Sequence, residues 1–388
     1  MKAYIFESRG RLILKDVAAP VISDIPDDRR AAILRPRYVS PCSSDVHTVF
    51  GGSKPRRENM ILGHEGLAEV VETGSEVRDF KKGELVAVSA VMPDIPGGTG
   101  HEGFPFSGGK LGRNMDGLFA ELFKVPDADM NLAKIPEGLS PEAALMSVDV
   151  MTTGFSAAEY ADIRRADTVI VMGTGPIGLM AIAAVKRLGA GPVIAMGSEK
   201  REECIRLSRE YGADMYISYR SGDIIFDNGR VSEKYAPLGK AYEMASAANS
   251  LGSPAVSRIF ELTGSRGAER ILICGGGKRS LMSACDMASY GTGTVVNAAY
   301  IEGTENPELP LFSLGKGMAG KTFKFIYCKG GRARIEEMMK IAGKRGESET
   351  LDPAPLVTHR LKGFENIPAA LEMMREKPAG LIKVMVEI

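Results

Sequence analysis

The sequence predicts an α/β protein of two domains, one rich in short strands and one built as a doubly wound sheet. Three observations support this expectation. The chain has 388 residues, which is more than one hydrophobic core usually serves. Residues 1–150 read as short strands separated by glycine and proline. From about residue 151, short apolar runs alternate with helical segments, as they do in a doubly wound sheet.

In the first part, Leu67–Val71 and Glu84–Val88 are β-type runs flanked by turn residues. The glycine-rich segment Gly97–Gly117 reads as a loop. In the second part, Thr168–Met172 is a fully apolar run of the kind found in buried parallel strands. The expected elements that follow it are a helix at Leu179–Leu188, a strand at Val193–Met196, a helix at Arg201–Tyr211, strands at Arg270–Cys274 and Thr294–Asn297, helices at Arg332–Gly343 and Ile367–Glu376, and a closing strand at Leu381–Ile388.

One segment does not fit this alternation. Phe226–Ser253 falls where such a sheet normally passes quickly from strand to helix. We interpret it as an insertion with one helix and assign it no role.

A glycine motif follows the apolar run Thr168–Met172 and opens a helix, which is the context a dinucleotide site requires. Its sequence, G-T-G-P-I-G, gives the candidate cofactor-binding residues Gly173, Gly175, Pro176, Ile177 and Gly178. The first glycine permits a tight turn, the second lets the backbone approach a pyrophosphate, and the third lets the helix pack against the strand. A strand–helix turn without a ligand is the alternative. The motif predicts a Rossmann domain that binds a nicotinamide cofactor.

The end of the next strand bears on the choice of cofactor. NAD-preferring folds usually place an acid there, whereas this chain has Gly197 and Ser198, followed after one residue by Lys200 and Arg201. The neutral pair and the two cations favour a 2′-phosphate, and hence NADP. Glu199 argues for NAD, which remains the alternative.

A candidate metal site lies upstream of the glycines. Cys42 begins the run C-S-S-D-V-H, and His64 and Glu65 lie in G-H-E-G. Thiolate, imidazole and carboxylate together suit Zn²⁺, and a catalytic zinc uses three protein ligands with one open position. Taken alone, a cysteine is more often a small buried apolar side chain, but the combination favours a metal.

These motifs together resemble the medium-chain zinc alcohol dehydrogenases. Further stretches resemble the tetrameric, NADP-dependent secondary alcohol dehydrogenases of bacteria: Asn59–Glu65, Asp127–Leu132, Asp149–Phe155, Leu356–His359 and Gly363–Ile367. The resemblance covers nearly the whole chain except Phe226–Ser253. It implies a GroES-like, β-rich catalytic domain formed by residues 1–151 and 327–388, with a Rossmann domain at residues 152–326. It also implies a homotetramer.

The resemblance assigns roles residue by residue. Cys42, His64 and Asp149 match the three zinc ligands, and Glu65 matches a carboxylate that can enter or leave the zinc shell. Other matches are Ser44 as the hydroxyl that hydrogen-bonds the substrate oxygen, His47 as the end of the proton relay, Lys377 near the cofactor phosphates, Tyr219 beside the 2′-phosphate, and Ala90, Tyr300, Tyr327 and Cys328 along the substrate pocket.

Two features depart from the family pattern. Glu199 stands where the subfamily has its phosphate-binding arginine, so Arg201 is expected as the shifted equivalent. Residues 90–126 contain no cysteine, whereas many relatives hold a four-cysteine structural zinc there. We therefore expect one catalytic zinc and no structural zinc.

Composition limits the kinds of binding partner that we expect for this protein. With 49 basic and 49 acidic residues, the chain has no net charge to favour nucleic acid or an anionic membrane. The five scattered cysteines and an N-terminus without a long apolar run indicate a cytoplasmic protein. The expected substrate is an alcohol, with its ketone or aldehyde as the oxidised form. The alternatives are a polyol, sugar or bulkier-carbonyl dehydrogenase of the same family, a zinc-free quinone-type reductase, and a non-catalytic cofactor-binding protein. The intact Cys/His/Asp set argues against the last two.

Overall fold

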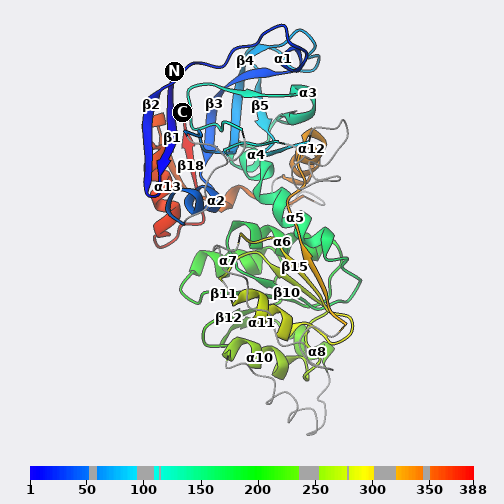
Figure 1. Cartoon of the computed structure of the whole chain (residues 1–388). Coiled ribbons are helices and arrows are strands. Elements are labelled where there is room, and N and C mark those ends of the chain that lie inside the picture. Colours follow the sequence, from blue (N-terminus) through cyan, green and yellow to red (C-terminus); the bar gives the residue numbers. More distant parts are fainter. Residues whose placement is uncertain are drawn as a thin grey trace. The chain divides into compact units, whose positions relative to one another are not determined.

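The computed structural model describes residues 1–51, 59–93, 109–112, 115–235, 253–277, 279–300, 320–343 and 350–388. The chain divides into two compact units (Figure 1). One unit combines Met1–Thr152 with Lys329–Ile388, and the other is Thr153–Cys328. Among the described residues, no helix is long and apolar enough to cross a membrane.

The first unit is built on a mixed, mostly antiparallel sheet. Its strand order is β17 (Val357–Lys362), β18 (Lys383–Glu387), β3 (Ala32–Ser40), β4 (Glu65–Thr73), β5 (Leu85–Val88) and β9 (Leu132–Lys134), with β8 (Phe123–Val125) also paired to β3. Strands far apart in the sequence meet here, because Val386 of β18 pairs with Val39 of β3. The C-terminal strand therefore forms part of the same sheet as β3 and β4.

Hairpins and short helices complete this unit. They are the hairpin β1 (Lys2–Ser8) and β2 (Arg11–Asp16), the pair β6 (Val91–Met92) and β7 (Gly109–Lys110), and the helices α1 (Pro26–Arg29), α2 (Ser43–Val46), α3 (Ala128–Asn131), α4 (Pro141–Val148), α12 (Arg332–Ile341) and α13 (Ile367–Glu376), with single turns η1 (His47–Gly51), η2 (Ala354–Leu356) and η3 (Phe364–Asn366). The apolar core joins strands from the first half of the chain to α13 and β18 through fully buried side chains such as Leu34, Phe119, Leu371 and Val386.

The second unit is a doubly wound sheet, as the sequence predicts. Its strand order is β13 (Ile224–Asp227), β12 (Met215–Ser218), β11 (Val193–Gly197), β10 (Val169–Met172), β14 (Arg270–Ile273), β15 (Thr294–Asn297) and β16 (Thr322–Phe325). All neighbours are parallel except β13, which runs antiparallel to β12. The order reverses at β10, so the crevice beyond its carboxyl end is the expected position for a dinucleotide.

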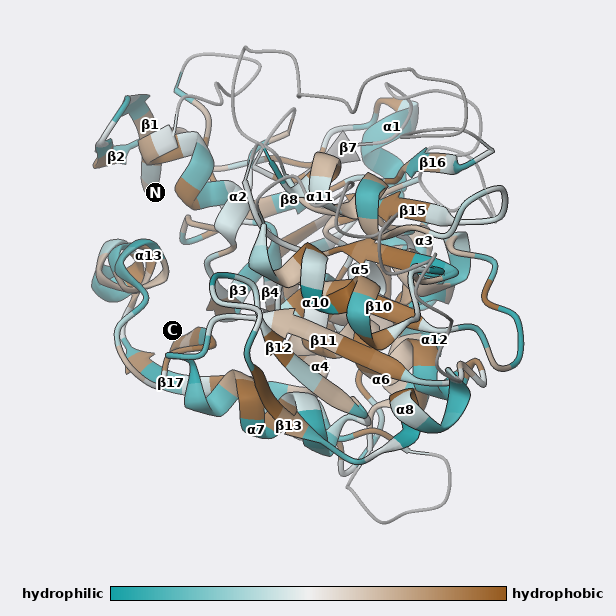
Figure 2. Cartoon of the chain, turned by 90° about the horizontal axis from the view of Figure 1, so that it is seen from below, coloured by the Kyte–Doolittle hydropathy of each residue, from teal (hydrophilic) through white to brown (hydrophobic). Residues whose placement is uncertain are grey.

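The helices of this unit follow the strands. They are α5 (Val150–Tyr160), which begins in the first unit, and α6 (Pro176–Arg187), α7 (Glu202–Glu210), α8 (Arg230–Lys234), α10 (Pro254–Leu262) and α11 (Ser280–Met287). Hydrophobic colour runs along β11 and α6, whereas α7 carries both kinds of colour (Figure 2). All four residues of β10 are buried, which accounts for the uninterrupted apolar run in the sequence.

One expectation needs correction. The segment Gly97–Gly117 is not loop throughout, since Gly109–Lys110 forms β7; its residues 97–108, 113 and 114 lie outside the described residues. The insertion Phe226–Ser253 begins with the last residues of β13 and contains α8, while residues 236–252 lie outside the described residues.

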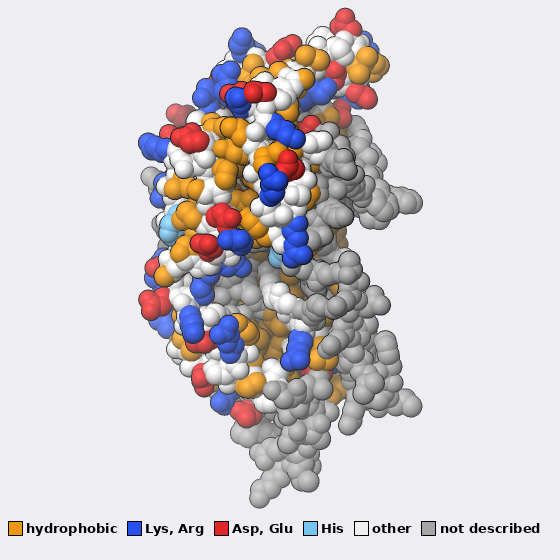
Figure 3. Space-filling model, turned by 60° about the vertical axis from the view of Figure 1, so that its left-hand side comes forward, with side chains coloured by type: hydrophobic (Ala, Val, Ile, Leu, Met, Phe, Trp, Pro, Cys, Tyr) orange, Lys and Arg blue, Asp and Glu red, His pale blue; other side chains and the backbone are white. Residues whose placement is uncertain are grey.

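On the face drawn in Figure 3, acidic and basic side chains are interspersed, in keeping with the balanced charge.

Candidate functional site

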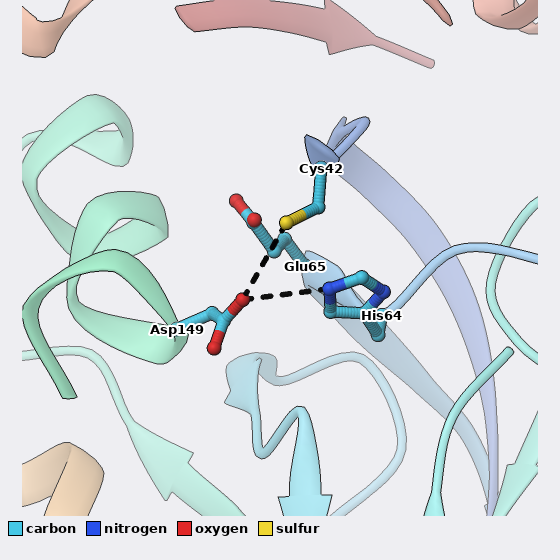
Figure 4. A group of neighbouring side chains, drawn as sticks. All are labelled: Cys42, His64, Glu65 and Asp149. Atoms are coloured by element: carbon cyan, nitrogen blue, oxygen red, sulfur yellow. Dashed lines mark hydrogen bonds and ion pairs between the residues drawn. The ribbon is translucent and has the colours of Figure 1, made fainter. Parts of the chain in front are cut away.

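Four side chains that could bind a metal meet in the first unit (Figure 4). They are Cys42 from the turn after β3, His64 and Glu65 where β4 begins, and Asp149 at the end of α4. One ligand atom from each lies within 4.8 Å of the others. His64, Glu65 and Asp149 are buried, and Cys42 is half-buried. The structure therefore brings together the complete set of metal ligands expected from the sequence.

Cys42 is held at the start of α2 by a reciprocal cap. Its backbone N–H donates to the Asp45 carboxylate at 2.9 Å, while its own side chain accepts from the backbone of Asp45. The turn before His64 needs a glycine, because Gly63 has φ +91° and an added Cβ would lie 2.4 Å from the Phe119 ring. These local constraints fix the direction of the Cys42 and His64 side chains.

Asp45 also orients the His64 ring. Its carboxylate lies 3.4 Å from Nδ1 of His64. The opposite nitrogen, Nε2, lies 3.4 Å from the Asp149 carboxylate and 3.4 Å from the Ser44 hydroxyl. A carboxylate behind an imidazole is the usual way in which proteins direct the other ring nitrogen toward a metal. Sequence analysis did not single out Asp45, although it lies within the C-S-S-D-V-H motif.

A buried lysine that the sequence analysis missed lies beside the cluster. Lys383, the first residue of β18, places Nζ 2.7 Å from both carboxylate oxygens of Glu65 and donates to the Pro41 carbonyl oxygen at 3.0 Å. Both side chains of this ion pair are almost completely buried. The sequence did contain a sign of this buried lysine, because it stands among apolar residues in the closing run L-I-K-V-M-V-E-I.

Burial and charge act against each other in this pair. Burial raises the pKa of the Glu65 carboxyl, while the nearby Lys383 ammonium opposes that rise. Burial alone would lower the pKa of Lys383, but the negative charges of Glu65 and Cys42 outweigh it and the pKa is raised. Lys383 is therefore favoured in its protonated form, while burial still makes Glu65 harder to ionise.

The residues present fit a zinc ion. Both carboxylate oxygens of Glu65 already lie 2.7 Å from the Lys383 ammonium, so the fit depends on the chemistry of the donor set. Three acidic groups and one imidazole within 4.8 Å are the donor chemistry that zinc takes. A dication would also relieve the mutual repulsion of these groups.

Ser44 and His47 lie at the two ends of one helical turn. Ser44 is on α2, and His47 begins the π-helical turn η1. Thr48 Oγ1 donates to the Ser44 carbonyl oxygen at 2.9 Å and braces this turn. The Ser44 hydroxyl is close to the candidate metal site, because it lies 3.4 Å from Nε2 of His64.

The glycine motif of the second unit forms the turn between β10 and α6. Gly173 has φ +89°, and Gly175 is the N-cap of α6 with Pro176 as its first residue. Ile177 follows in the first turn of the helix. A Cβ on Gly178 would lie 1.8 Å from the Gly173 carbonyl oxygen, whereas a Cβ on Gly175 would meet nothing within 4 Å. The third glycine thus serves packing, and the second leaves open space where a pyrophosphate would approach.

The carboxyl end of β11 explains why the expected acid is missing. An added Cβ on Gly197 would lie 2.1 Å from the Tyr216 hydroxyl and 2.3 Å from Thr174 Oγ1. Tyr216 is fully buried, and its hydroxyl lies 3.0 Å from Thr174 Oγ1 and donates to the Ser198 carbonyl oxygen at 3.1 Å. A side chain at position 197 is therefore excluded by its neighbours.

The other predicted site residues are spread over both units. Lys200 donates its backbone N–H to Ser198 Oγ, and Arg201 is the N-cap of α7. Tyr219 is half-exposed after β12. The remaining positions are Lys377 after α13 and the buried Ala90 in the first unit, and the half-exposed Tyr300 and Tyr327 and the buried Cys328 in the second. Their roles stay predictions.

Residues 28–137 match the model of the alcohol dehydrogenase GroES-like domain. The whole chain is 40% identical to an NADP-dependent isopropanol dehydrogenase of Thermoanaerobacter brockii, covering 99% of that protein. It is 39% identical over 92% of both chains to the protein of the same name from Clostridium beijerinckii. The solved alcohol dehydrogenase TADH from Thermus sp. ATN1 shares the fold over 100% of both chains, with a TM-score of 0.73 and 25% identity.

Similarity of this extent defines the class: the chain is a dehydrogenase, an oxidoreductase that acts on CH–OH groups. More particularly, it belongs to the medium-chain, zinc-type alcohol dehydrogenase family. This confirms the resemblance stated from the motifs, and with it the pairing of a GroES-like domain with a Rossmann domain.

The glycine motif offers a matched pair of variants. Gly178→Ala should lower the melting temperature, because the new methyl group overlaps the Gly173 carbonyl oxygen. Gly175→Ala should leave the melting temperature unchanged and weaken dinucleotide binding, because its methyl group enters only open space. Thermal unfolding and calorimetric titration with NADP⁺ measure the two effects. Equal destabilisation by both changes would contradict this division of roles.

The buried ion pair predicts a large effect on stability. Lys383→Met removes the cation and leaves Glu65 buried beside other acidic groups, which should cost roughly 3–5 kcal/mol of unfolding free energy. The double variant Glu65→Gln/Lys383→Met removes both charges and should recover a substantial part of that loss. Denaturant unfolding of the metal-free protein is the measurement. A single variant as stable as the wild type would show that the pair contributes nothing.

Proposed function

We propose that this protein is a zinc-dependent, NADP(H)-linked dehydrogenase of small secondary alcohols, which also reduces the corresponding ketones. The observation that supports it most directly is the buried cluster of Cys42, His64, Glu65 and Asp149, in a chain 40% identical to an NADP-dependent isopropanol dehydrogenase. In this proposal residues 1–151 and 327–388 act as the catalytic domain, and residues 152–326 hold the cofactor.

Cys42, His64 and Asp149 would hold the zinc, with Glu65 as a fourth donor that exchanges with substrate or water. When bound, zinc acts as a Lewis acid that lowers the pKa of an alcohol so that hydride can leave at neutral pH. Nζ of Lys383 donates a hydrogen bond to Oε1 of Glu65 at 2.7 Å. This contact gives the carboxylate a second partner when it is not on the metal.

The proton would leave through the protein. The Ser44 hydroxyl lies 3.4 Å from Nε2 of His64, so it is near any ligand of the cluster. It would accept a hydrogen bond from the alcohol and pass the proton toward His47 one turn away. An imidazole nitrogen can accept a proton and pass it on to water, which suits the end of a relay.

The glycine turn between β10 and α6 would bind the cofactor pyrophosphate, with Lys377 near the phosphates. Ser198, Lys200, Arg201 and Tyr219 would surround the 2′-phosphate. Ala90, Tyr300, Tyr327 and Cys328 would line a mostly apolar substrate pocket, which favours a small alcohol over a polyol. A homotetramer in the cytoplasm completes the proposal.

Kinetics with a panel of substrates tests this function. We expect kcat/KM to be higher for propan-2-ol and butan-2-ol than for sorbitol, and higher with NADP⁺ than with NAD⁺. The physical reason is an apolar pocket that leaves extra hydroxyl groups without partners. A clear preference for polyols would favour the polyol dehydrogenases of the same family, and no turnover with any alcohol would favour a binding protein.

Metal analysis tests the zinc assignment. We expect one zinc per chain, because residues 90–126 contain no cysteine for a second site. Cys42→Ala and Asp149→Ala should abolish turnover while NADP⁺ binding, measured by calorimetry, remains close to wild type. Two zinc ions per chain would contradict the count, and full activity without Cys42 would contradict the ligand.

A further inference from the structure

The carboxyl ends of β11 and β12 form a charged edge that the proposed function uses only in part. Ser218 pairs with Gly197 in the sheet, and the Tyr219 backbone N–H donates to the Gly197 carbonyl oxygen at 3.0 Å. In a doubly wound sheet the adenosine ribose lies at the end of this second strand. The turn after β12 is therefore in position to contact a group on the ribose 2′-oxygen.

We propose that Arg220, seated on Tyr219, recognises the 2′-phosphate of NADP, and that Ser218 holds the Glu199 carboxylate aside so that this recognition is possible. This inference rests on the proposed function. It adds one specificity-determining residue, Arg220, and one positioning residue, Ser218, which the sequence analysis did not identify.

The first observation is that β11 cannot itself supply the acid that selects NAD. The space beside Gly197 is filled by the Tyr216 hydroxyl and Thr174 Oγ1, at 2.1 and 2.3 Å from an added Cβ. Glu199 is therefore the acidic residue nearest this strand end in sequence. Its direction decides whether the edge attracts or repels a phosphate.

The second observation is the direction of Glu199. The Ser218 hydroxyl is fully buried and donates to Oε2 of Glu199 at 2.8 Å. The same hydroxyl oxygen accepts the backbone N–H groups of Arg220 and Ser221, each at 3.3 Å. A hydroxyl has one proton to donate, and here that proton is committed to the carboxylate. Glu199 is thus tied to the turn after β12.

Glu199 remains ionised in this position. Hydrogen bonds from its own backbone and from Ser218 lower the pKa of the Glu199 carboxyl, with the charges of Arg220 and Lys200 adding to the effect. Its charge is therefore balanced locally by the two neighbouring cations. Arg220 and Lys200 are the cations whose charges act on this carboxylate, and Arg201 follows Lys200 in the sequence at the start of α7.

The third observation is the conformation of Arg220. Its Nε–H donates to the Tyr219 hydroxyl at 2.7 Å, and its guanidinium carbon lies 5.4 Å from the centre of the Tyr219 ring. The hydrogen bond to Tyr219 uses one of the five N–H donors of the guanidinium group and restrains the Arg220 side chain. The two terminal amino groups keep the fork geometry that binds phosphate. A preorganised fork loses less conformational entropy when it binds.

Binding of two cofactor fragments tests the proposal without catalysis. Adenosine 2′,5′-bisphosphate carries the 2′-phosphate and 5′-AMP lacks it, so the ratio of their dissociation constants, measured by calorimetry on the full-length protein, isolates this edge. Arg220→Ala should weaken the bisphosphate roughly 10- to 150-fold and leave 5′-AMP within about twofold. Arg206→Ala is the matched control, because this arginine of α7 pairs with Glu203 and Glu210.

Ser218 is tested by a rescue. Ser218→Ala releases Glu199 and should weaken the bisphosphate roughly 3- to 10-fold. Glu199→Gln added to Ser218→Ala should restore binding, since the released group is then neutral. A role in folding alone would lower the melting temperature and affect both fragments equally, and would not be rescued.

The outcomes separate this inference from the proposed function. If the wild type binds the bisphosphate more tightly than 5′-AMP and Arg220→Ala keeps that preference, the inference is overturned but the proposed function stands. Loss of the preference in Arg201→Ala would then identify Arg201 as the arginine that binds the phosphate. A Ser218→Ala variant with an unchanged ratio overturns the positioning role. A wild type that prefers 5′-AMP overturns both the inference and the assignment of NADP.

Discussion

The mutual repulsion of acidic side chains at the metal cluster constrains the first unit. Cys42, Glu65 and Asp149 bring their ligand atoms, with one nitrogen of His64, within 4.8 Å in a mostly buried site. Like charges at that distance are unfavourable in a medium of low dielectric constant. Lys383 offsets part of this cost, and a bound dication would offset more. The zinc site and the stability of the unit are therefore expected to be linked, since a ligand that binds only the folded state stabilises it.

This constraint gives a reason for the C-terminal return of the chain. The cation beside Glu65 comes from β18, which lies between β17 and β3 in the sheet. The register of β18 against β3 places Lys383 inward, and a shift of one residue would turn it to the other face. The Ser40 hydroxyl donates to the Val384 carbonyl oxygen at 2.7 Å and helps to fix that register two residues before Cys42. The last strand thus positions Lys383 beside Glu65, one of the four side chains of the candidate metal site.

The sequence predicted the parts of this protein that depend on local pattern. Apolar runs located β10 and β11, the glycine motif located the turn before α6, and residue types with their context located Cys42, His64 and Glu65. Contacts between distant segments were missed. Asp45 stood in a quoted motif, yet its role depends on the approach of His64. Lys383 lies 318 residues from its partner Glu65, and no spacing rule connects them. Tyr216 and Ser218 acquire meaning only when β12 is placed beside β11.

Cofactor choice also depends on contacts between segments that are distant in the sequence. Motif comparison looks for an acid or an arginine directly after β11, but selectivity is a difference between two binding free energies and depends on every charge that faces the ribose. Here Tyr216 fills the position from which an acid would act, and the hydroxyl of Ser218 determines where Glu199 points. An acidic residue whose carboxylate is hydrogen-bonded to Ser218, beside an arginine supported by a tyrosine ring, does not by itself exclude a phosphate. The carboxylate at position 199 therefore indicates NAD only if it is free to turn toward the ribose, and its contact with β12 is what opposes that turn.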